Sequence, residues 1–324
     1  MTLEYGDGGS CDLVTLGETM ALFMGPPASP LRPGSGVLFS FAGAESNVAI
    51  GVRRLGHTVA FISRVGDDDM GRAIVRGLLG EGVDVSGVRY DDSAPTSLMV
   101  RQHRTSDIVS VAYYRREGAG AKLSPHDVDA EVIRRARLLH VTGITPSLSA
   151  TARDALTGAV CVASSAGVTV SLDVNHRELL WTRSAARDML RPLLPSVDIL
   201  FGGADELLLL EPSASSAEEA AGLLHTHGVG DVVLKRGPRG ASAWHDGERS
   251  DQPAVEVPAV DPVGAGDAFV AGYLSAHLDG EGVVERLRRG SLCGAFAVSV
   301  HGDWEGAPRR GELETVGARG HVER

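Results

Sequence analysis

The sequence predicts an α/β protein in which a mostly parallel central sheet is covered by helices on both faces. Short apolar runs, several of them rich in β-branched residues, alternate along the chain with longer amphipathic segments. The apolar runs are nearly continuous, as expected for strands that are buried on both faces. Aromatic residues make up only 5% of the chain whereas alanine, glycine and valine are abundant, and such small side chains suit close packing of helices on a sheet.

The strands and helices can be assigned in chain order. The predicted strands lie at residues 13–16, 59–65, 138–142, 168–173, 197–201 and 232–235. The predicted helices lie at 44–55, 69–79, 127–136, 151–163, 184–194 and 217–224, and two consecutive helices at 266–278 and 283–300 close the domain. In the first helix Val48, Val52 and Leu55 share one face, and Gly56 follows as a stop signal.

Two regions interrupt this alternation. Residues 23–41 are rich in proline, glycine and serine, and residues 95–116 contain alternating polar and apolar stretches. Both patterns are typical of hairpins, and we interpret them as a small β lid inserted in the α/β body. We therefore expect a single domain over residues 1–312 and a frayed tail at 313–324.

The bulk properties exclude several classes of function. The 324 residues carry a formal net charge of −11, so the positive footprint that nucleic acid requires is missing. No apolar run reaches membrane-spanning length, and the N-terminus lacks the features of a secretory signal. Cys11, Cys161 and Cys293 are far apart and form no CxxC pair, which disfavours a zinc site or disulfide framework. We expect a cytoplasmic protein without nucleic-acid or membrane partners.

The most informative segment is the run DPVGAGDAFVAGY at residues 261–273. Its Gly264-Ala265-Gly266 turn opens a predicted helix whose first turn carries Asp267. The exposed N–H groups and partial positive charge of such a helix start favour an anion, for example a transferring phosphoryl group. An aspartate beside that group could accept a proton from an attacking hydroxyl. The alternative is that Asp267 only balances the helix dipole.

This run resembles the second sequence signature of the PfkB (ribokinase-like) carbohydrate kinases. The resemblance implies a three-layer α/β/α sandwich with a β lid, ATP and Mg²⁺ as cofactors, and phosphorylation of a primary hydroxyl of a sugar. It also implies that Gly264, Ala265 and Gly266 form an anion hole, with Gly264 and Gly266 facing the nucleotide, and that Asp267 is the catalytic base and contacts the substrate.

The N-terminal half carries the same resemblance. The segment GAESNVA at 43–49 is similar to the family's sugar-binding motif, which implies substrate contacts for Gly43, Ala44 and Asn47. The segment RVGDD at 64–68 follows at the usual place. The resemblance therefore covers nearly the whole chain.

Within the family, the chain most closely resembles the 2-keto-3-deoxygluconate kinases. Three segments carry this similarity, YYRR at 113–116, HVTGITP at 140–146 and DVNHR at 173–177 with Leu180 and Trp181. The substrate of that subgroup is a keto acid, and a guanidinium or a tyrosine hydroxyl can bind its carboxylate.

Tyr114, Arg115 and Arg177 are therefore the candidates that face the substrate carboxylate. The alternative for either arginine is a solvated surface charge. Residues 117–121 read EGAGA where the subgroup usually has a Gly-Ser-Ala-Ala-Ser-like run, and Ala42 and Val174 also depart from its pattern. These departures concern the identity of the sugar more than the class of reaction.

The segment VVLKRGPRGA at 232–241 resembles the strand and turn that lie beside the nucleotide in this family. The resemblance implies nucleotide contacts for Lys235, Gly237 and Gly240, and it places the last helix, with Ser291 and Cys293, along the adenine. Lys235 could instead be a surface charge at the end of a strand. No Walker-type phosphate loop is present.

One residue is the candidate metal ligand. Glu206 matches the last position of the family's Asn-x-x-Glu motif, whose asparagine position is Gly203 in this chain. A carboxylate near a triphosphate suits Mg²⁺, which keeps bound water and takes few protein ligands. The alternative is a carboxylate that only caps a helix. The resemblance also allows activation by a monovalent cation such as K⁺ and a homodimer through the lid.

Three other functions remain as alternatives. The nearest is another PfkB-family kinase that acts on fructose, ribose or a related deoxy-keto acid. A catalytically silent sugar-binding homologue is disfavoured by the intact Gly-Ala-Gly-Asp run. A dinucleotide-dependent oxidoreductase fits the α/β pattern only, because no GxGxxG turn follows the first strand.

Overall fold

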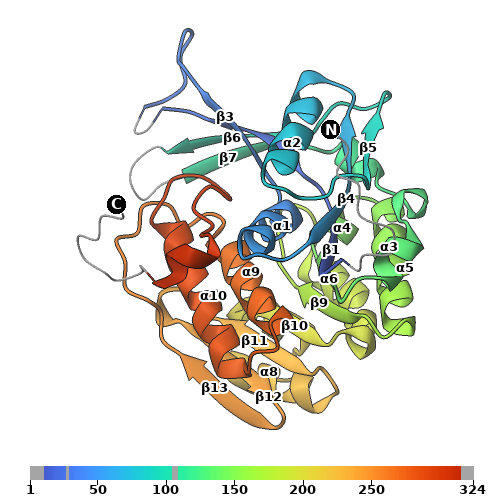
Figure 1. Cartoon of the computed structure of the whole chain (residues 1–324), viewed down its shortest axis with the longest axis vertical. Coiled ribbons are helices and arrows are strands. Elements are labelled where there is room, and N and C mark those ends of the chain that lie inside the picture. Colours follow the sequence, from blue (N-terminus) through green and yellow to red (C-terminus); the bar gives the residue numbers. More distant parts are fainter. Residues whose placement is uncertain (1–10, 27–28, 104–108, 315–324) are drawn as a thin grey trace.

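The computed structural model describes residues 11–26, 29–103 and 109–314. These residues form a nine-stranded main sheet and a separate four-stranded sheet (Figure 1). The main sheet has the order β13-β12-β11-β10-β9-β8-β1-β4-β5. Its strands are β1 (Leu13–Leu16), β4 (Val59–Gly66), β5 (Val88–Asp91), β8 (Leu138–Thr142), β9 (Thr169–Asp173), β10 (Ile199–Gly203), β11 (Asp231–Lys235), β12 (Ala241–His245) and β13 (Glu248–Gln252).

The strand pairing of the main sheet is parallel from β5 to β11, and only β12 and β13 are antiparallel. Strand β1 lies between β4 and β8, with Leu13 opposite both Val59 and Leu138. The order of the strands reverses between β1 and β8. In sheets of this kind a ligand crevice forms at such a reversal, outside the carboxyl ends of the strands.

The two faces of the sheet each carry a hydrophobic core, because alternate strand residues point to opposite faces. Leu13 and Phe61 belong to one core, and their neighbours Val14 and Ile62 belong to the other. The first core is covered by α1 (Ala44–Arg54), α2 (Asp69–Gly80), α9 (Ala265–Leu278) and α10 (Val283–Val298). The second core is covered by α3 (Ala130–Arg134), α5 (Ala150–Ser165), α6 (Arg183–Leu190), α7 (Ala204–Leu210) and α8 (Ala217–Thr226). The predicted α/β/α sandwich is confirmed.

Several short helical segments connect these elements. They are α4 (Thr145–Leu148) and the 3₁₀ helices η1 (Ala119–Lys122), η2 (Pro125–Asp127), η3 (Arg191–Ser196), η4 (Gly237–Arg239) and η5 (Arg310–Glu314).

The second sheet is the predicted lid. Its order is β3-β2-β6-β7, formed by β3 (Leu38–Ala42), β2 (Met20–Met24), β6 (Leu98–His103) and β7 (Val109–Tyr114). Strands β2 and β6 pair in parallel, and the other two pairs are antiparallel. Figure 1 shows this sheet extending away from the body. The small β lid is confirmed, although its first strand begins at Met20, before the predicted boundary; positions 27–28 and 104–108 of the prediction lie outside the described residues.

Some element boundaries differ from the sequence predictions for clear reasons. The predicted helix at 184–194 ends as α6 at Leu190 and continues as η3, because Pro192 and Pro195 lack the N–H that an α-helix requires. The hairpin of β12 and β13 was missed, although Asp246-Gly247 forms its turn with positive φ angles of 50° and 77°. An Asp-Gly pair between two strands is a strong hairpin signal.

The end of the described chain belongs to the body. Leu313, at the start of the predicted tail, packs against a small core of Leu55, Ala268, Cys293 and Ala297. The remainder of that predicted tail, from residue 315 onward, lies outside the described residues. Among the helices that the structure describes, none has the length and apolar character to cross a membrane.

Candidate active site

The amino end of α9 is shaped by a glycine that adopts a left-handed conformation. Gly264 is the N-cap of the helix with φ 75°, and a Cβ there would collide with the backbone oxygen of Asp303. The turn before it is held by Asp261, whose Oδ1 accepts a hydrogen bond of 3.1 Å from the backbone N–H of Val263. At Gly264 the backbone therefore approaches the loop that contains Asp303 (the 303 loop) more closely than any other residue type would allow.

Asp267 lies in the first turn of α9, partly buried. Its Oδ2 accepts a 2.8 Å hydrogen bond from Nδ2 of Asn47 on α1. Burial raises the pKa of Asp267 to about 7, and the nearby charges of Asp303 and Asp173 add to that rise. The Asn47 hydrogen bond and the positive charge of Arg177 act in the opposite direction. Asp267 is therefore balanced between its neutral and ionised forms near neutral pH, as a general base requires.

A large cavity of about 1260 Å³ lies between the body and the lid and is bordered by Asp267. The cavity is lined by residues from the start of α1, the lid strands, the loop after β9 and the start of α9. It brings together the predicted residues Gly43, Ala44, Asn47, Tyr114, Arg115, Arg177, Gly264 and Asp267. Residues as far apart as 43 and 267 thus line one space.

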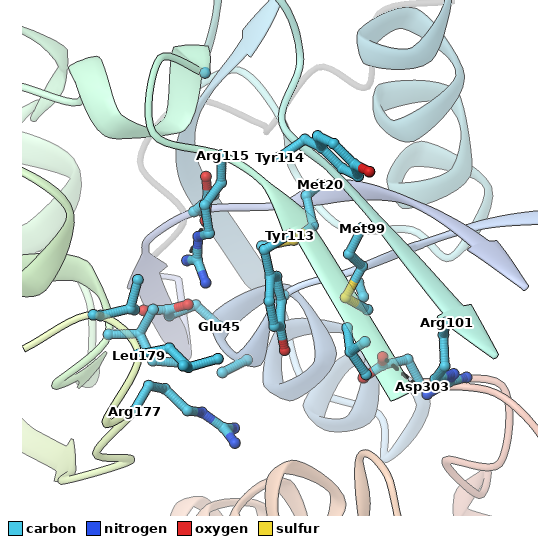
Figure 2. Close-up of a pocket in the computed structure, with 18 of the residues that line it drawn as sticks. Met20, Glu45, Met99, Arg101, Tyr113, Tyr114, Arg115, Arg177, Leu179 and Asp303 are labelled. Carbon is cyan, nitrogen blue, oxygen red and sulfur yellow. Dashed lines mark ion pairs between the residues drawn. The ribbon is translucent and has the colours of Figure 1, made fainter. Parts of the chain in front are cut away.

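The three candidates for carboxylate binding lie differently in the large cavity (Figure 2). Arg115 is buried and forms an ion pair with Glu18, so its charge is already compensated. Arg177 is exposed in the cavity, and its charge acts on Asp267. Tyr114 is 64% exposed and points away from the cavity centre, whereas its neighbour Tyr113 points inward. The two tyrosines diverge because successive strand residues face opposite sides of the sheet.

Two buried glutamates border the large cavity, and sequence reasoning missed both. Glu18 pairs with Arg115 and accepts a 2.7 Å hydrogen bond from Ser97. Glu45 accepts hydrogen bonds from the hydroxyls of Thr142 and Thr145 at 2.8 and 2.7 Å. Burial raises the pKa of each glutamate. Glu18 could have been found, because it follows the first buried strand where the strand order reverses.

Arg101 and Asp303 also border the large cavity and were not predicted. Arg101 is a charged residue within an alternating lid strand, which is a weak sequence signal. Asp303 follows the last long helix and reaches Asn47 only through the tertiary fold, with a 2.7 Å hydrogen bond. No pattern in the sequence near Asp303 indicates this contact.

A small cavity of about 570 Å³ lies on the other side of the α9 start. It brings together the predicted nucleotide residues Lys235, Gly237, Gly240, Gly266 and Ser291, together with Ala265 of the predicted anion hole. Apolar residues such as Val257, Pro262 and Val298 complete much of its lining.

Two predicted nucleotide residues, Gly264 and Cys293, are not part of this lining, and Gly264 borders the large cavity instead. Cys293 is 1% exposed and packs in the core beside Ala268, and burial raises the pKa of its thiol to about 12. Gly294 and Ala295 line the small cavity in its place. The physical reason is helical spacing, because Ser291, Gly294 and Ala295 share one face of α10 whereas Cys293 faces α9.

Lys235 and Glu206 both form hydrogen bonds with other residues of the chain. The Nζ of Lys235 donates a 2.6 Å hydrogen bond to Oδ2 of the buried Asp173, at the edge of the small cavity. Glu206 uses both carboxylate oxygens to accept backbone N–H groups, from His176 at 2.8 Å and from Gly203 at 2.6 Å. Glu206 thus caps α7 and ties the loop after β9 to that helix.

The start of α9 separates the two cavities. Val263, Gly264 and Asp267 border the large cavity, whereas Ala265 and Gly266 border the small one. A group bound in either cavity would therefore meet the first-turn N–H groups of α9. This arrangement suits transfer of an anionic group from one ligand to another.

The chain is similar in sequence to known proteins over nearly its whole length. The family description "pfkB family carbohydrate kinase" matches residues 11–310. A 2-dehydro-3-deoxygluconokinase of Bacillus subtilis is 36% identical over 311 residues, which span 93% of this chain and 94% of that protein. A 2-dehydro-3-deoxygalactonokinase of Haloferax volcanii is 35% identical over 296 residues, spanning 91% and 93% of the two chains.

Solved structures agree with these sequence relatives. A PfkB protein from Polaromonas sp. JS666 is 35% identical with a TM-score of 0.84, covering 94% of this chain and 99% of that one. A putative ribokinase II from E. coli in complex with ATP and Mg²⁺ is 29% identical with a TM-score of 0.87, covering 95% and 99%. Sequence and fold agree, and the chain belongs to the pfkB family of carbohydrate kinases.

Proposed function

We propose that this carbohydrate kinase transfers the γ-phosphoryl group of ATP to the primary hydroxyl of a 2-keto-3-deoxy sugar acid, with 2-keto-3-deoxygluconate as the first candidate. The observation that carries the proposal is the position of the α9 start between the two cavities. The sugar acid would bind in the large cavity beneath the lid, and the nucleotide in the small cavity. The two substrates would then meet at Asp267.

In this mechanism Asp267 accepts the proton of the attacking hydroxyl, and the hydroxyl oxygen forms a bond to phosphorus as the bond to the ADP oxygen breaks. The backbone N–H groups of Ala265, Gly266 and Asp267 stabilise the charge on the moving phosphoryl group. The hydrogen bond from Asn47 orients the carboxylate of Asp267 toward the large cavity. The lid excludes water, which would otherwise accept the phosphoryl group.

ATP with Mg²⁺ is the proposed phosphoryl donor, and the E. coli neighbour crystallised with both supports it. The described residues contain no cluster of three or more metal-ligating side chains, so the phosphates and water would hold most of the Mg²⁺. Glu206 fits a role at one remove, because both of its oxygens already accept backbone N–H groups and would reach the ion through bound water. Mg²⁺ would neutralise charge on the phosphates.

The substrate class rests on the relatives and on Arg177. The B. subtilis relative acts on 2-keto-3-deoxygluconate by its name, and Arg177 offers an exposed guanidinium inside the large cavity. Arg115 forms an ion pair with Glu18, so it would help to shape the large cavity rather than bind the carboxylate of the substrate. The H. volcanii relative favours the galactonate epimer as the second candidate.

Other features of the proposal come from the family resemblance. They are activation by a monovalent cation such as K⁺, a homodimer through the lid, a cytoplasmic location, and the absence of nucleic-acid and membrane partners. Titration of K⁺ in the kinase assay and measurement of the molar mass in solution test the first two.

The deciding experiment measures ADP release with Mg-ATP and each sugar acid for the wild type and Asp267→Asn. We expect kcat to fall by about 10³-fold in the variant, because the base is lost, with little change in substrate binding. The matched control is Asp69→Asn, which removes an exposed first-turn carboxylate of α2 outside both cavities and should leave kcat unchanged. Full activity of Asp267→Asn would refute the base assignment. Rapid turnover of fructose or ribose with no turnover of either keto acid would refute the substrate.

A further inference from the structure

The lid carries a buried positive charge that reaches the catalytic end of the body. Arg101 on β6 is 0% exposed, yet it extends to two carboxylates that belong to other parts of the chain. Its Nη2 lies 3.6 Å from Oδ2 of Asp261, and its Nη1 lies 3.5 Å from Oδ2 of Asp303. Figure 2 shows the guanidinium beside Asp303 at the edge of the large cavity. A third contact, a 3.0 Å hydrogen bond from Nη2 to Sδ of Met24, holds the side chain within the lid.

Each of the two carboxylates holds a different part of the α9 start. Asp261 is 0% exposed, and it accepts the backbone N–H of Val263 in the turn that precedes the helix. The backbone oxygen of Asp303 lies where a Cβ of residue 264 would be, and the carboxylate of Asp303 accepts a hydrogen bond from Nδ2 of Asn47. The same Nδ2 atom donates to Asp267, so a chain of direct contacts runs from Arg101 through Asp303 and Asn47 to the proposed base.

The chemistry of these contacts explains why a cation is needed there. Two carboxylates buried without a positive partner would repel each other and lose much of their hydration, which is unfavourable. A guanidinium can compensate both at once because its nitrogens are spread over a rigid plane. The distances of 3.5 and 3.6 Å show that Arg101 acts on them mainly through its charge.

We propose that Arg101 is a positioning residue for phosphoryl transfer, which keeps Asp303 ionised and the turn at Asp261 in place, and thereby holds Asn47 and Asp267 in the reactive arrangement. Because Arg101 belongs to the lid, the arrangement is complete only when the lid lies against the body. This inference rests on the proposed role of Asp267 as base.

The charges around Asp303 and Asp267 set the expected pH dependence. Asp303 faces Arg101 from β6, Asn47 from α1, Asp267 from α9, Asp261 from the turn before α9 and Glu305 from its own loop. Asp267 also interacts electrostatically with Asp173, Arg177 and Lys235.

Burial raises the pKa of Asp303 to about 6, against the opposing effects of Arg101 and the Asn47 hydrogen bond. Removal of Arg101 would raise the pKa values of the coupled Asp303 and Asp267 pair, so a higher pH would be needed to ionise both.

The test compares kcat, KM and pH profiles of the wild type, Arg101→Met and Arg101→Lys in the ADP-release assay. For Arg101→Met we expect kcat at pH 7 to fall about 100-fold, KM for Mg-ATP to stay within about threefold, and the acid limb of kcat to move up by about one pH unit. Arg101→Lys keeps the charge, so its acid limb should stay in place and its kcat should remain within about tenfold of the wild type.

The matched control is Arg64→Met, which also removes an arginine that pairs with two aspartates, Asp91 and Asp127, but lies outside both cavities. It should lower stability and leave kcat and its pH profile unchanged. If Arg101→Met changes only stability, or raises KM for the sugar acid with an unmoved acid limb, Arg101 is structural or binds substrate directly and the inference is wrong.

A second variant covers the case in which Arg101→Met does not fold. Arg101→Met combined with Asp303→Asn removes both charges of that pair and keeps an oxygen for the Asn47 hydrogen bond. We expect the double variant to fold, its kcat to stay at least about tenfold below that of the wild type because residue 303 cannot ionise, and its acid limb to lie no higher than that of the wild type because Asp303 no longer titrates beside Asp267. A folded double variant with the kcat of the wild type would refute the inference. Failure of Asp267→Asn to lose activity would instead refute the base assignment itself.

Discussion

Asp267 has surroundings that oppose its own ionisation. Burial is the largest cause, and the carboxylates of Asp303 and Asp173 add to it, so its pKa lies at about 7 and not near 3.8. A carboxylate of this kind costs folding free energy when it is ionised. The same property makes it a stronger base for a hydroxyl proton than an ordinary aspartate would be.

This cost predicts a pH-dependent effect of Asp267→Asn on stability. Between about pH 4 and 7 the unfolded chain loses the Asp267 proton while the folded protein keeps it, so the wild-type free energy of unfolding falls as pH rises through that range. The variant lacks this loss. We expect Asp267→Asn to be more stable than the wild type by about 2 kcal/mol at pH 8 and equal to it at pH 4, as measured by urea unfolding. Equal stability at both pH values would contradict the raised pKa.

At the residue scale, the motifs indicated which segments meet at the start of α9, but they did not give the direction of individual side chains. Asn47 and Asp267 come together as the motifs implied. Tyr113 rather than Tyr114 points into the large cavity, and Cys293 faces the core. These two differences depend on strand and helix phase, which a motif does not specify.

At the scale of elements, the start of α9 depends on one glycine. Gly264 has both a positive φ and a Cβ position filled by the backbone of Asp303. Gly280, just after the other end of α9, also has a positive φ of 80°, but nothing lies near its Cβ position. A comparison of Gly264 with Gly280 therefore separates the effect of backbone strain from the effect of steric collision.

Substitution of these two glycines by alanine should therefore give different results. Gly280→Ala adds only the strain of a left-handed residue, and we expect a loss of about 1 kcal/mol in stability with unchanged kcat. Gly264→Ala must also displace the 303 loop, and we expect a larger loss of stability together with a fall in kcat of at least about 100-fold. Urea unfolding and ADP release measure the two effects. Equal consequences for both variants would show that the approach of the 303 loop to α9 does not matter.

Elements with strong periodicity could be located from the sequence, whereas polar edge elements could not. Strands β1 and β8 match their predicted bounds, because both consist mainly of apolar residues and are buried along their whole length. Strand β13 has the sequence ERSDQ and lies at the edge of the sheet, so its pattern carries no apolar signal. It is a strand because β12 pairs with it.

At the scale of the whole molecule, two sheets and two cavities meet at one helix end. The lid strands border the large cavity only, whereas the loop after β11 and helix α10 border the small one. Ligands in the two cavities should therefore stabilise different parts of the chain.

Hydrogen exchange can test this separation. We expect the sugar acid to slow exchange of the amides in β6 and β7, and a non-hydrolysable ATP analogue with Mg²⁺ to slow exchange at residues 235–240 and in the first turn of α9. At 100 times the dissociation constant, each ligand should add about 2.7 kcal/mol to the free energy of unfolding. Protection of the lid strands by the nucleotide alone would contradict the proposed placement of the two substrates.

The sequence by itself determined the fold class, the lid and the residues of the turn that opens α9, because apolar periodicity and the run at 261–273 are local properties of the chain. Only the tertiary structure decided which charges surround that turn. Arg101, Asp261 and Asp303 come from a lid strand, a turn and a C-terminal loop, and their contacts depend on how distant segments pack. The pairing of Arg115 with Glu18 was decided in the same way. Electrostatic interactions act through space, so their partners are fixed only when the chain is folded.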